Sequence, residues 1–472
     1  MNDRSDSATR AERDSMGEMQ VPAHALYGAS TQRAVLNFPI SDLRYPRRFI
    51  KALGQIKLAA AQTNGELGLI DEGVARAVVE AAQEVVDGKH DAHFVVDIFQ
   101  TGSGTSTNMN ANEVIAHVVA GHKRTDKKVH QNDHVNFGQS SNDVIPTATH
   151  VAAASAIKED LLPALHTLQS SLEKKSQEFW QIVKTGRTHL QDATPIRLGQ
   201  EFLGYAGQIE RARKRANHAL DELCEVALGG TAVGTGINTH PEFAKRTCAK
   251  LAEMTGLPIR ETSNHFQAQS SLDNCVAASG ALKTIAVSLT KIANDIRWLG
   301  SGPRAGIGEL ELPAVQPGSS IMPGKVNPVI CESVLMVCVQ VIGNDAAITV
   351  GGQSGNFEIN LTMPIVGYDL LQSISLLAHA CTNFAKQCVD GLKATDKGPQ
   401  MVERGLAICT SLAPIIGYDA AADIAKVAAK TGKTIREVAR EKTKLSDAEL
   451  DSILNPALMC EPSADRVGAG GG

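Results

Sequence analysis

Aromatic residues are scarce in this chain and make up only 4% of its 472 residues. Strands favour aromatic and β-branched side chains, and sheet cores rely on them for buried area. Alanine and leucine are abundant instead, and both residues form helices readily. The shortage of aromatic residues therefore favours close helix–helix packing over a sheet sandwich.

Basic residues are not in excess, because the formal net charge is −5. No cluster of lysine and arginine is dense enough for a phosphate backbone, so we do not expect nucleic-acid binding. No unbroken apolar run reaches the roughly 20 residues that cross a bilayer, so no membrane span is expected. The N-terminal stretch MNDRSDSATRAERDSMGE is polar and partly acidic, unlike a signal or transit peptide. We therefore expect a cytoplasmic protein.

The nine cysteines include no CxxC pair. Most of them lie in apolar stretches with helical spacing, which predicts reduced thiols in the protein core. Such thiols are typical of the cytoplasm, where disulfides are rare. Their positions are Cys224, Cys248, Cys275, Cys331, Cys338, Cys381, Cys388, Cys409 and Cys460.

Two histidine pairs have the spacing of metal ligands but no convincing third ligand. His130 and His134 enclose Asp133, and His90 lies three residues before His93. Metal sites built from protein side chains usually need three or four ligands. We therefore expect no metal.

Apolar side chains recur at helical spacing through the middle of the chain, as in Leu282, Ile285, Leu289, Ile292 and Ile296. Spacings near 3.5 residues over such lengths predict long helices packed nearly parallel in a bundle. Such helices are apolar on more than one face, which favours an oligomer with a hydrophobic interface. Further stripes occupy residues 161–172, 334–341 and 365–389.

These patterns predict a mainly all-α protein of three domains. Residues 1–138 should form a mostly helical N-terminal domain, and residues 139–397 should form the central helical bundle. Residues 398–472 should form a small helical domain, in which SDAELDSIL begins with a serine N-cap before acidic residues. Its final segment, EPSADRVGAGGG, is expected to be disordered.

Five polar, glycine-rich segments interrupt the predicted helices. Loops between rigid helices commonly carry ligand contacts, and these are rich in serine, threonine, asparagine and histidine. They therefore indicate a small, polar, anionic ligand. The segments are 101–110, 130–143, 186–195, 229–240 and 318–328.

The segment GSSIMPGKVNP, residues 318–328, superficially resembles a phosphate-binding loop. A P-loop requires four residues between its glycines and a hydroxyl after the lysine, but five residues separate Gly318 from Gly324 and Val326 follows Lys325. The segments 102–107 and 229–236 do not match a dinucleotide fingerprint either. A plain surface turn is the alternative. The single lysine among small polar residues favours an anion anchor.

Taken together, the loops resemble those of the fumarase/aspartase superfamily, and among its branches the class II fumarases. The matching segments are TGSGTSTNMNANE, VNFGQSSND, GRTHLQDATPIRLGQE, GGTAVGTGINTHPEF, GSSIMPGKVNP and SGNFEIN, in this order along nearly the whole chain. Aspartases usually have PAKVNP in the serine loop and glutamine at the position of His189, so Gly324 and His189 favour fumarase. The chain departs from the family pattern HPND…VNKSQSSND at Gln131, His134, Phe137 and Gly138.

The resemblance implies a three-domain fold with a central helix bundle, and a homotetramer whose active sites are shared between subunits. It also implies reversible hydration of fumarate to L-malate, both small dicarboxylates. The alternatives are aspartate ammonia-lyase or another fumarate-releasing lyase of the superfamily, and a structural protein without activity. Hydration involves no redox step, so no organic cofactor is implied.

The chemistry requires that a carboxylate takes up the electrons of a broken C–H bond, which preorganised donors must stabilise. Lys325 and Asn327 are suited to this role. The resemblance implies that Ser319 is the base, with Ser320 as the alternative within the pair. It also implies that His189 activates water and that Glu332 orients its imidazole.

Small polar side chains on the other loops are candidates for holding the substrate. Some of them could equally be helix caps or turn formers. The candidates are Ser103, Thr105, Ser140, Ser141, Asn142 and Thr188. The resemblance also implies an accessory carboxylate site, at His130, Asn132 and Asp133, which the departures at Gln131 and His134 put in question.

Overall fold

The computed structural model describes residues 8–464 and residue 467, and these divide into two compact units. The first unit comprises Met1–Pro163, Ala212–Ala286 and Val337–Ala378; the second comprises Ala164–Arg211, Val287–Met336 and His379–Gly472. The predicted disorder of the tail concerns mostly residues 465–466 and 468–472, which lie outside the described residues. The division into three domains at 138 and 397 stays a prediction.

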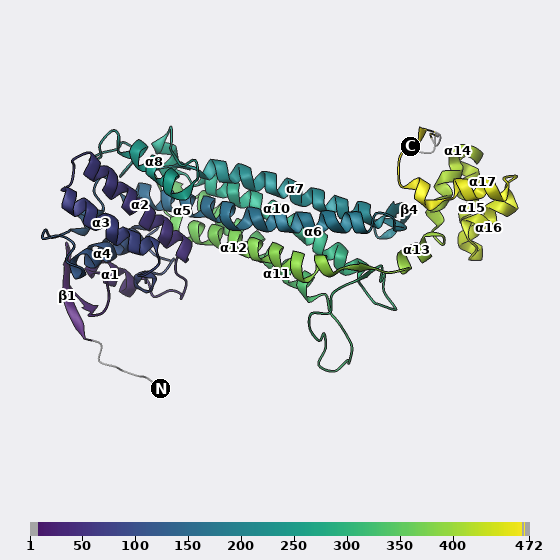
Figure 1. The fold of residues 1–472 in the computed structure, drawn as a ribbon, viewed down its shortest axis with the longest axis horizontal. Coiled ribbons are helices and arrows are strands. Elements are labelled where there is room, and N and C mark those ends of the chain that lie inside the picture. The colour runs from purple at the N-terminus through teal and green to yellow at the C-terminus, as the bar shows by residue number, and fades with distance from the viewer. Residues whose placement is uncertain (1–7, 465–466, 468–472) are drawn as a thin grey trace. The chain divides into compact units, whose positions relative to one another are not determined.

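The fold is mainly α-helical, as expected, and its strands form only two-stranded sheets among the described residues (Figure 1). The first unit contains the hairpin β1–β2 and a cluster of helices in which α2 packs against α3, α5 and α8. Its elements are β1 Thr9–Asp14, β2 Gly17–Pro22, α1 Ala29–Asn37, α2 Arg47–Glu66, α3 Glu72–Val86, η1 Asp91–His93, α4 Thr105–Gly121, η2 Gln131–Val135, α5 Ser141–Ala156, η3 Ile157–Leu161, β5 Glu225–Val226, α8 Phe243–Thr255, β6 Arg260–Glu261, α9 His265–Ser270, β8 Gly355–Asn356 and β9 Ile359–Asn360.

The long helices confirm the apolar stripes of the sequence and contribute residues to both units. They are α6 Leu162–Glu178, α7 Leu198–Leu223, α10 Asp273–Leu299, α11 Val329–Gly352 and α12 Met363–Gln387. Within the first unit, polar bonds connect three of them. Asp345 on α11 accepts from Ser279 Oγ and Lys283 Nζ on α10 at 2.8 and 2.6 Å, and Asn344 donates to Ser373 Oγ on α12 at 3.0 Å.

Two of these helices, α10 and α11, are long and apolar enough to cross a membrane by length and composition alone. Neither helix is an unbroken apolar run, because polar residues such as Asn344 and Asp345 of α11 interrupt the apolar sequence. Core helices of soluble proteins satisfy the same criterion. Ser279 and Lys283 of α10, and Asn344 and Asp345 of α11, form the interhelical bonds just described.

The second unit contains the hairpin of β3 Val183–Thr188 and β4 Gln191–Arg197, and the small helices of the C-terminal region. Those helices enclose an apolar core of their own, centred on Leu412, Ile424, Val438 and Leu454. The predicted N-cap is confirmed: Ser446 forms a capping box with Glu449 at the start of α17. The remaining elements are β7 Leu310–Glu311, η4 Val389–Gly391, β10 Lys393–Ala394, α13 Lys397–Val402, η5 Leu406–Leu412, α14 Ala413–Ile416, α15 Tyr418–Thr431, α16 Ile435–Lys442, α17 Asp447–Ile453 and η6 Pro456–Met459.

None of the nine cysteines forms a disulfide, and seven are buried, which confirms the prediction of reduced core thiols. Burial raises the pKa of Cys248 and Cys275 to about 12. A thiol is a poor nucleophile and metal ligand when its thiolate is disfavoured in this way. These cysteines therefore act as small apolar side chains.

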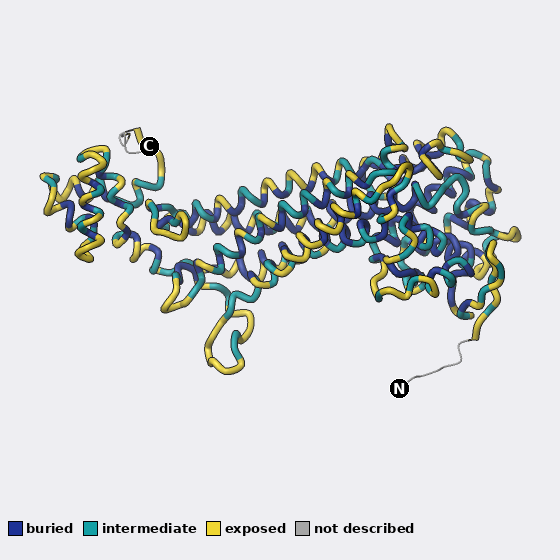
Figure 2. Tube along the Cα trace, turned by 180° about the vertical axis from the view of Figure 1, so that it is seen from behind, coloured by how far each residue is buried: buried dark blue, intermediate teal, exposed yellow. Residues whose placement is uncertain are grey.

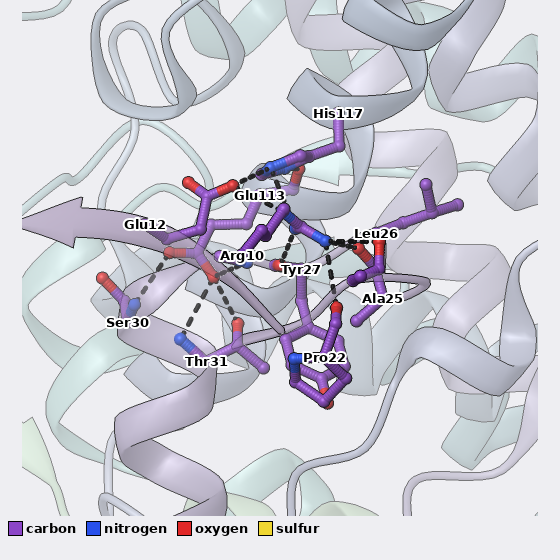
Figure 3. A network of polar contacts seen from close by, with 12 residues as sticks. Arg10, Glu12, Pro22, Ala25, Leu26, Tyr27, Ser30, Thr31, Glu113 and His117 are labelled. Carbon is purple, nitrogen blue, oxygen red and sulfur yellow. Dashed lines mark hydrogen bonds and ion pairs between the residues drawn. The ribbon is translucent and has the colours of Figure 1, made fainter. Parts of the chain in front are cut away.

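A buried carboxylate joins the N-terminal hairpin region to α4 (Figure 3). Glu113 on α4 accepts hydrogen bonds from the backbone N–H groups of Gly28, Ser30 and Thr31, and from Thr31 Oγ1, at 2.6–3.1 Å. These donors belong to the first turn of α1, whose positive end favours a negative charge. Next to Glu113, Arg10 donates to the carbonyl groups of Ala25 and Tyr27, just before α1. The network fixes α4, the helix that begins at Thr105.

We predict that Glu113→Gln destabilises the protein by about 1–3 kcal/mol, because an amide group replaces one acceptor oxygen and leaves a buried N–H without a partner. Urea denaturation followed by circular dichroism measures this loss. The exposed Glu18→Gln, in the same hairpin region, is the control and should change stability by less than about 0.5 kcal/mol. Equal midpoints for the two variants contradict the role of Glu113.

Candidate active site

Three predicted hydroxyl groups of the first unit form one continuous chain. Thr105 Oγ1 lies 2.8 Å from Ser103 Oγ and 2.7 Å from Ser141 Oγ. Thr105 is the first residue of α4 and Ser141 the first residue of α5, so two helix N-termini meet at these hydroxyl groups. Such ends favour negative charge and present unpaired N–H groups. The arrangement is suited to binding a carboxylate.

Gly104 permits this meeting of helices. It is the N-cap of α4 with a φ of 71°, a left-handed conformation that glycine adopts without strain. A Cβ atom at this position would lie 2.8 Å from the side chain of Ile145 on α5. Any larger residue would separate Thr105 from Ser141.

The segment Ser140–Asn142 is attached to the loop after β5 by the buried residue Asp143. Its carboxylate accepts hydrogen bonds from the backbone N–H groups of Ser140, Gly229 and Thr231 at 3.0, 2.9 and 3.0 Å. Burial raises the pKa of Asp143, and these three bonds oppose that shift. Two of the glycine-rich segments predicted to bind ligand are thus brought together.

Asn142, a predicted substrate-binding residue, donates from Nδ2 to the carbonyl group of Ala232 at 2.7 Å. Ser140 is the N-cap of α5 and forms a capping box with Asp143. The Ser140 hydroxyl therefore acts as a helix cap in this structure, which was one of the two roles considered for it. Asp143 itself was missed in the sequence, although S-x-x-D is a signal for a capping box.

Lys57 binds the residues just before Ser140, and the sequence did not predict this role. It is fully buried, and its Nζ donates to Asn136 Oδ1 at 2.9 Å and to Gln139 Oε1 at 3.0 Å. Burial lowers the pKa of Lys57 to about 7, and the negative charge of Asp143 opposes this shift. A lysine within the apolar stripe of α2 carries no sequence signal that separates it from a surface lysine.

In the second unit, the loop before α11 carries Ser319, Lys325 and Asn327, and it is largely exposed (Figure 2, yellow). The loop is closed at its base, because Gly318 N donates to the carbonyl group of Lys325 at 2.8 Å and Asn327 Nδ2 donates to that of Gly318 at 2.7 Å. A Cβ atom on Gly318 would lie 2.6 Å from the Lys325 oxygen. This close approach requires glycine.

Ser319 Oγ accepts two backbone hydrogen bonds, from Ile321 N at 3.2 Å and from Met322 N at 3.0 Å. Donors arranged around a hydroxyl oxygen stabilise it when it loses its proton. Ser320 has no such bonds among the described residues. The geometry therefore favours Ser319 over Ser320 as the reactive serine.

Lys325 is exposed and has no ion pair within the described part of the chain. Asn327 uses one of its two N–H donors on Gly318, which leaves the second for a ligand. Glu332 lies exposed in the first turn of α11, and its backbone N–H bonds to Pro328. No hydrogen bond joins its carboxylate to His189 among the residues described, so the predicted orienting contact is not present within one chain.

His189 lies at the tip of the β3–β4 hairpin in a strained turn. Thr188 pairs with Gln191, so His189 and Leu190 are the two turn residues, with φ of 56° and 59°. A two-residue turn of this kind favours Asn-Gly, and other residues pay about 1–2 kcal/mol each for the left-handed conformation. Strain of this size is commonly kept where function requires it. Thr188 and His189 are both exposed.

The predicted accessory residues form a compact π-helical turn at η2. His130 Nδ1 accepts from the N–H groups of Asn132 and Asp133 at 3.4 and 3.2 Å, so these donors are occupied. The nearby Lys127 pairs with Asp71 at 2.6 Å. His130 Nε2 and the Asn132 side-chain amide remain as donors for a carboxylate at this turn. The described residues contain no group of three or more His, Cys, Asp or Glu arranged to hold a metal ion.

Comparison with known proteins gives consistent matches along the chain. A family model described as lyase matches residues 17–343, and one described as fumarase C C-terminus matches residues 408–461. Fumarate hydratase class II of Methylorubrum extorquens is 51% identical over 462 residues, covering 97% of this chain and 98% of that protein. Fumarate hydratase class II of Halobacterium salinarum is 55% identical over 454 residues, with 95% and 97% covered.

Among solved structures, the recombinant class II fumarase from Schistosoma mansoni matches with a TM-score of 0.93. The two chains are 39% identical, and the match covers 96% of this chain and 99% of that chain. Likeness of this extent includes both described units and all five glycine-rich segments.

We predict that Asp143→Asn loosens the loop at Gly229–Thr231, because an amide nitrogen cannot accept the N–H bonds that a carboxylate accepts. Amide exchange in a peptide that covers this loop should become about tenfold faster, since bonds to a charged group contribute about 1.5–3 kcal/mol. Hydrogen–deuterium exchange mass spectrometry measures the rate.

Asn142→Ala is the matched control, because it removes only the bond to Ala232. It should leave exchange at Gly229 and Thr231 within about twofold of the parent. Equal acceleration in both variants contradicts a specific role for the Asp143 carboxylate.

Proposed function

Because the chain belongs to the class II fumarate hydratase family, and so catalyses the reversible hydration of fumarate to L-malate, we propose that its loop 318–328 removes the proton and that His189 transfers the water. The observation that carries this proposal is the pair of backbone N–H groups directed at Ser319 Oγ. The relatives compared above are fumarate hydratases, which leaves the ammonia-lyase alternative without support.

In the direction from malate, Ser319 is the base. Its oxyanion takes a proton from the carbon next to a carboxylate, and the electrons of the broken C–H bond move into that carboxylate. An ordinary serine hydroxyl is far too weak an acid to supply this oxyanion at neutral pH. The N–H groups of Ile321 and Met322, together with the positive charge of Lys325, stabilise it in a site from which water is excluded.

The carboxylate that receives the electrons becomes a dianion, and Lys325 and Asn327 stabilise it. Lys325, which has no ion pair among the described residues, contributes a positive charge, and Asn327 contributes its remaining N–H donor. The carbon–oxygen bond then breaks, and His189 gives a proton to the departing hydroxide, which leaves as water. In the reverse direction His189 takes a proton from the attacking water, with Glu332 orienting its imidazole.

The remaining carboxylate of the substrate lies at the meeting point of α4 and α5. Ser103, Thr105 and Ser141 hold it through the hydroxyl chain described above, and Ser140, Asn142 and Thr188 complete the substrate site. Two helix N-termini supply the favourable field. A second, weaker carboxylate site at His130, Asn132 and Asp133 belongs to the same proposal. No step involves redox chemistry, so no cofactor takes part.

The active enzyme is a cytoplasmic homotetramer in which subunits share active sites. The apolar surface of α11 supports assembly: its most apolar window has a mean hydropathy of 1.7, yet only 39% of that window is buried within one chain. Met336, Val339 and Val350 are among its exposed apolar side chains. Apolar patches of this kind mark protein interfaces. The missing contact between His189 and Glu332 is explained if the two belong to different subunits.

We predict that Lys325→Met lowers kcat for malate by about 10²–10³, because it removes a charge that acts where the dianion forms. Methionine keeps the length and apolar stem, so the loop should keep its shape. Fumarate appearance, followed by ultraviolet absorbance, measures the rate. Aspartate serves as the second substrate, and the parent protein should release no fumarate from it. Undiminished turnover of malate by Lys325→Met contradicts the proposed role.

Shared sites predict complementation between two inactive chains. Ser319→Ala and His189→Asn should each lose most activity, and mixing them during reassembly should restore part of it, because some sites then contain neither substitution. Activity is measured after native mass spectrometry has shown mixed tetramers. Mixed tetramers that stay inactive contradict sharing, and the parent mixed with Ser319→Ala controls for losses in reassembly.

A further inference from the structure

A buried group of four charges lies at the base of the hairpin that carries His189. Lys184 on β3 donates from Nζ to Glu201 Oε1 on α7 at 2.7 Å and contacts Glu309 Oε2 at 2.9 Å. Arg187, also on β3, donates to both oxygens of Glu309, at 2.6 and 3.2 Å. The side chains of Lys184 and Glu309 are only 1% and 4% exposed. Two cations and two carboxylates leave the group neutral.

Glu309 is held rigidly by its own backbone. Its N–H donates to the carbonyl group of Leu299 at 2.8 Å, and its carbonyl group accepts from Thr395 N at 3.0 Å. Helix α13 packs against β3 at Gly398. A Cβ atom at Gly398 would lie 3.3 Å from Lys184 Cβ and 3.7 Å from Glu309 Cγ. The carboxylate is therefore a fixed point, joined by its backbone to α10 and to the segment before α13.

The two cations on β3 differ in burial, and we assign them different roles: Lys184 is structural and Arg187 positions the hairpin. Lys184 satisfies the buried carboxylates, as packing alone requires. Arg187 is 23% exposed and lies beyond a register shift between Thr185 and Arg187. A bulge of this kind redirects the strand that follows. The bidentate Arg187–Glu309 contact thus fixes β3 at Arg187, two residues before the strained His189.

We propose that Glu309 is a positioning residue for His189: through Arg187 it holds the β3–β4 hairpin so that the left-handed turn His189–Leu190 presents the imidazole to the substrate. The turn residues do not favour this conformation themselves, and no side-chain hydrogen bond or ion pair holds His189 in the described chain. A fixed anchor below the turn compensates for the poor turn sequence. This inference rests on the proposed role of His189.

The first test is Glu309→Gln, which keeps the shape of the side chain but removes its charge and one acceptor oxygen. We expect kcat per folded tetramer to fall by about 10- to 100-fold, since a displacement of about 1 Å costs this much. KM should change less than about threefold, because Ser103, Thr105 and Ser141 lie on other loops and only Thr188 of the proposed substrate site lies on this hairpin. Tetramers are isolated by gel filtration before the assay, so that unfolded protein does not lower the apparent rate.

The second test asks whether a better turn replaces the anchor. Leu190→Asn places at the second turn position a residue that tolerates the left-handed conformation. Combined with Glu309→Gln, it should raise kcat at least about threefold above Glu309→Gln alone. A residue that only stabilises the fold would not respond to a change at an exposed turn, so this rescue distinguishes positioning from stability.

Lys175→Met is the matched control for stability. Lys175 is a buried lysine of the same unit, bonded to Leu392 O at 2.7 Å and to Glu178 Oε2 at 2.8 Å, and neither partner belongs to the hairpin. It should lower the melting temperature at least as much as Glu309→Gln and leave kcat within about twofold. If Leu190→Asn is itself poorly active, Arg187→Lys replaces it: Arg187→Lys and Glu309→Gln should each lower kcat, and the double variant should fall no further than the worse single one.

The inference is overturned if Glu309→Gln keeps kcat within twofold of the parent, or if Lys175→Met loses as much kcat. It is also overturned if the turn variant gives no rescue, or if the losses of Arg187→Lys and Glu309→Gln multiply. The separate variant His189→Asn distinguishes the two levels. Full activity in His189→Asn refutes the proposed function, whereas loss in His189→Asn without loss in Glu309→Gln refutes only the positioning role.

Discussion

The proposed substrate-binding face of the first unit depends on one buried carboxylate that accepts backbone N–H bonds from two loops. Asp143 faces Ser140, Gly229 and Thr231 at hydrogen-bond distance, in a position where burial disfavours its charge. A buried carboxylate without these donors would be costly, so the loops and the carboxylate stabilise one another. Glycine-rich loops have little preference for any conformation, and their order here comes from an acceptor on a rigid helix. Glu113 acts in the same way on the first turn of α1.

The second unit applies the same principle with side-chain cations in place of backbone donors. Lys184 and Arg187 bind the carboxylate of Glu309, which the surrounding backbone holds in place. A hairpin whose tip is strained cannot be positioned by its turn sequence, so its position must come from its base. Polar groups thus determine where each functional loop lies, while the apolar helices supply the rigid frame. Packing alone would fix the helices and leave the loops free.

The helices and the overall class could be predicted from the sequence, because apolar stripes at helical spacing in α10, α11 and α12 depend only on local periodicity. The loop segments could be named because serine, threonine, asparagine and lysine gather in short glycine-rich stretches, and the roles of Ser319, His189 and Glu332 were implied by the family resemblance. Lys57, Asp143 and Glu309 could not be found in this way. Their roles depend on partners far away in the chain, such as Gly229 for Asp143. The capping-box spacing of Ser140 and Asp143 is the one local signal among them, and it does not predict the bond to Gly229. The strain at Leu190 was missed for a related reason, since leucine is a poor signal for a tight turn.

The exposure of the serine loop connects catalysis to assembly. An oxyanion at Ser319 needs a site from which water is excluded, because water would weaken the hydrogen bonds and the Lys325 charge that stabilise it. In a single chain the loop lies open, and its apolar residues Ile321 and Met322 are exposed. The apolar face of α11, the helix that begins directly after this loop, is also exposed in a single chain. Another copy of the chain that covers α11 could also exclude water from the loop before it. Under the proposed function, we infer that the subunit interface and the environment that activates Ser319 form in one event, so that an isolated subunit is folded but has no functional base.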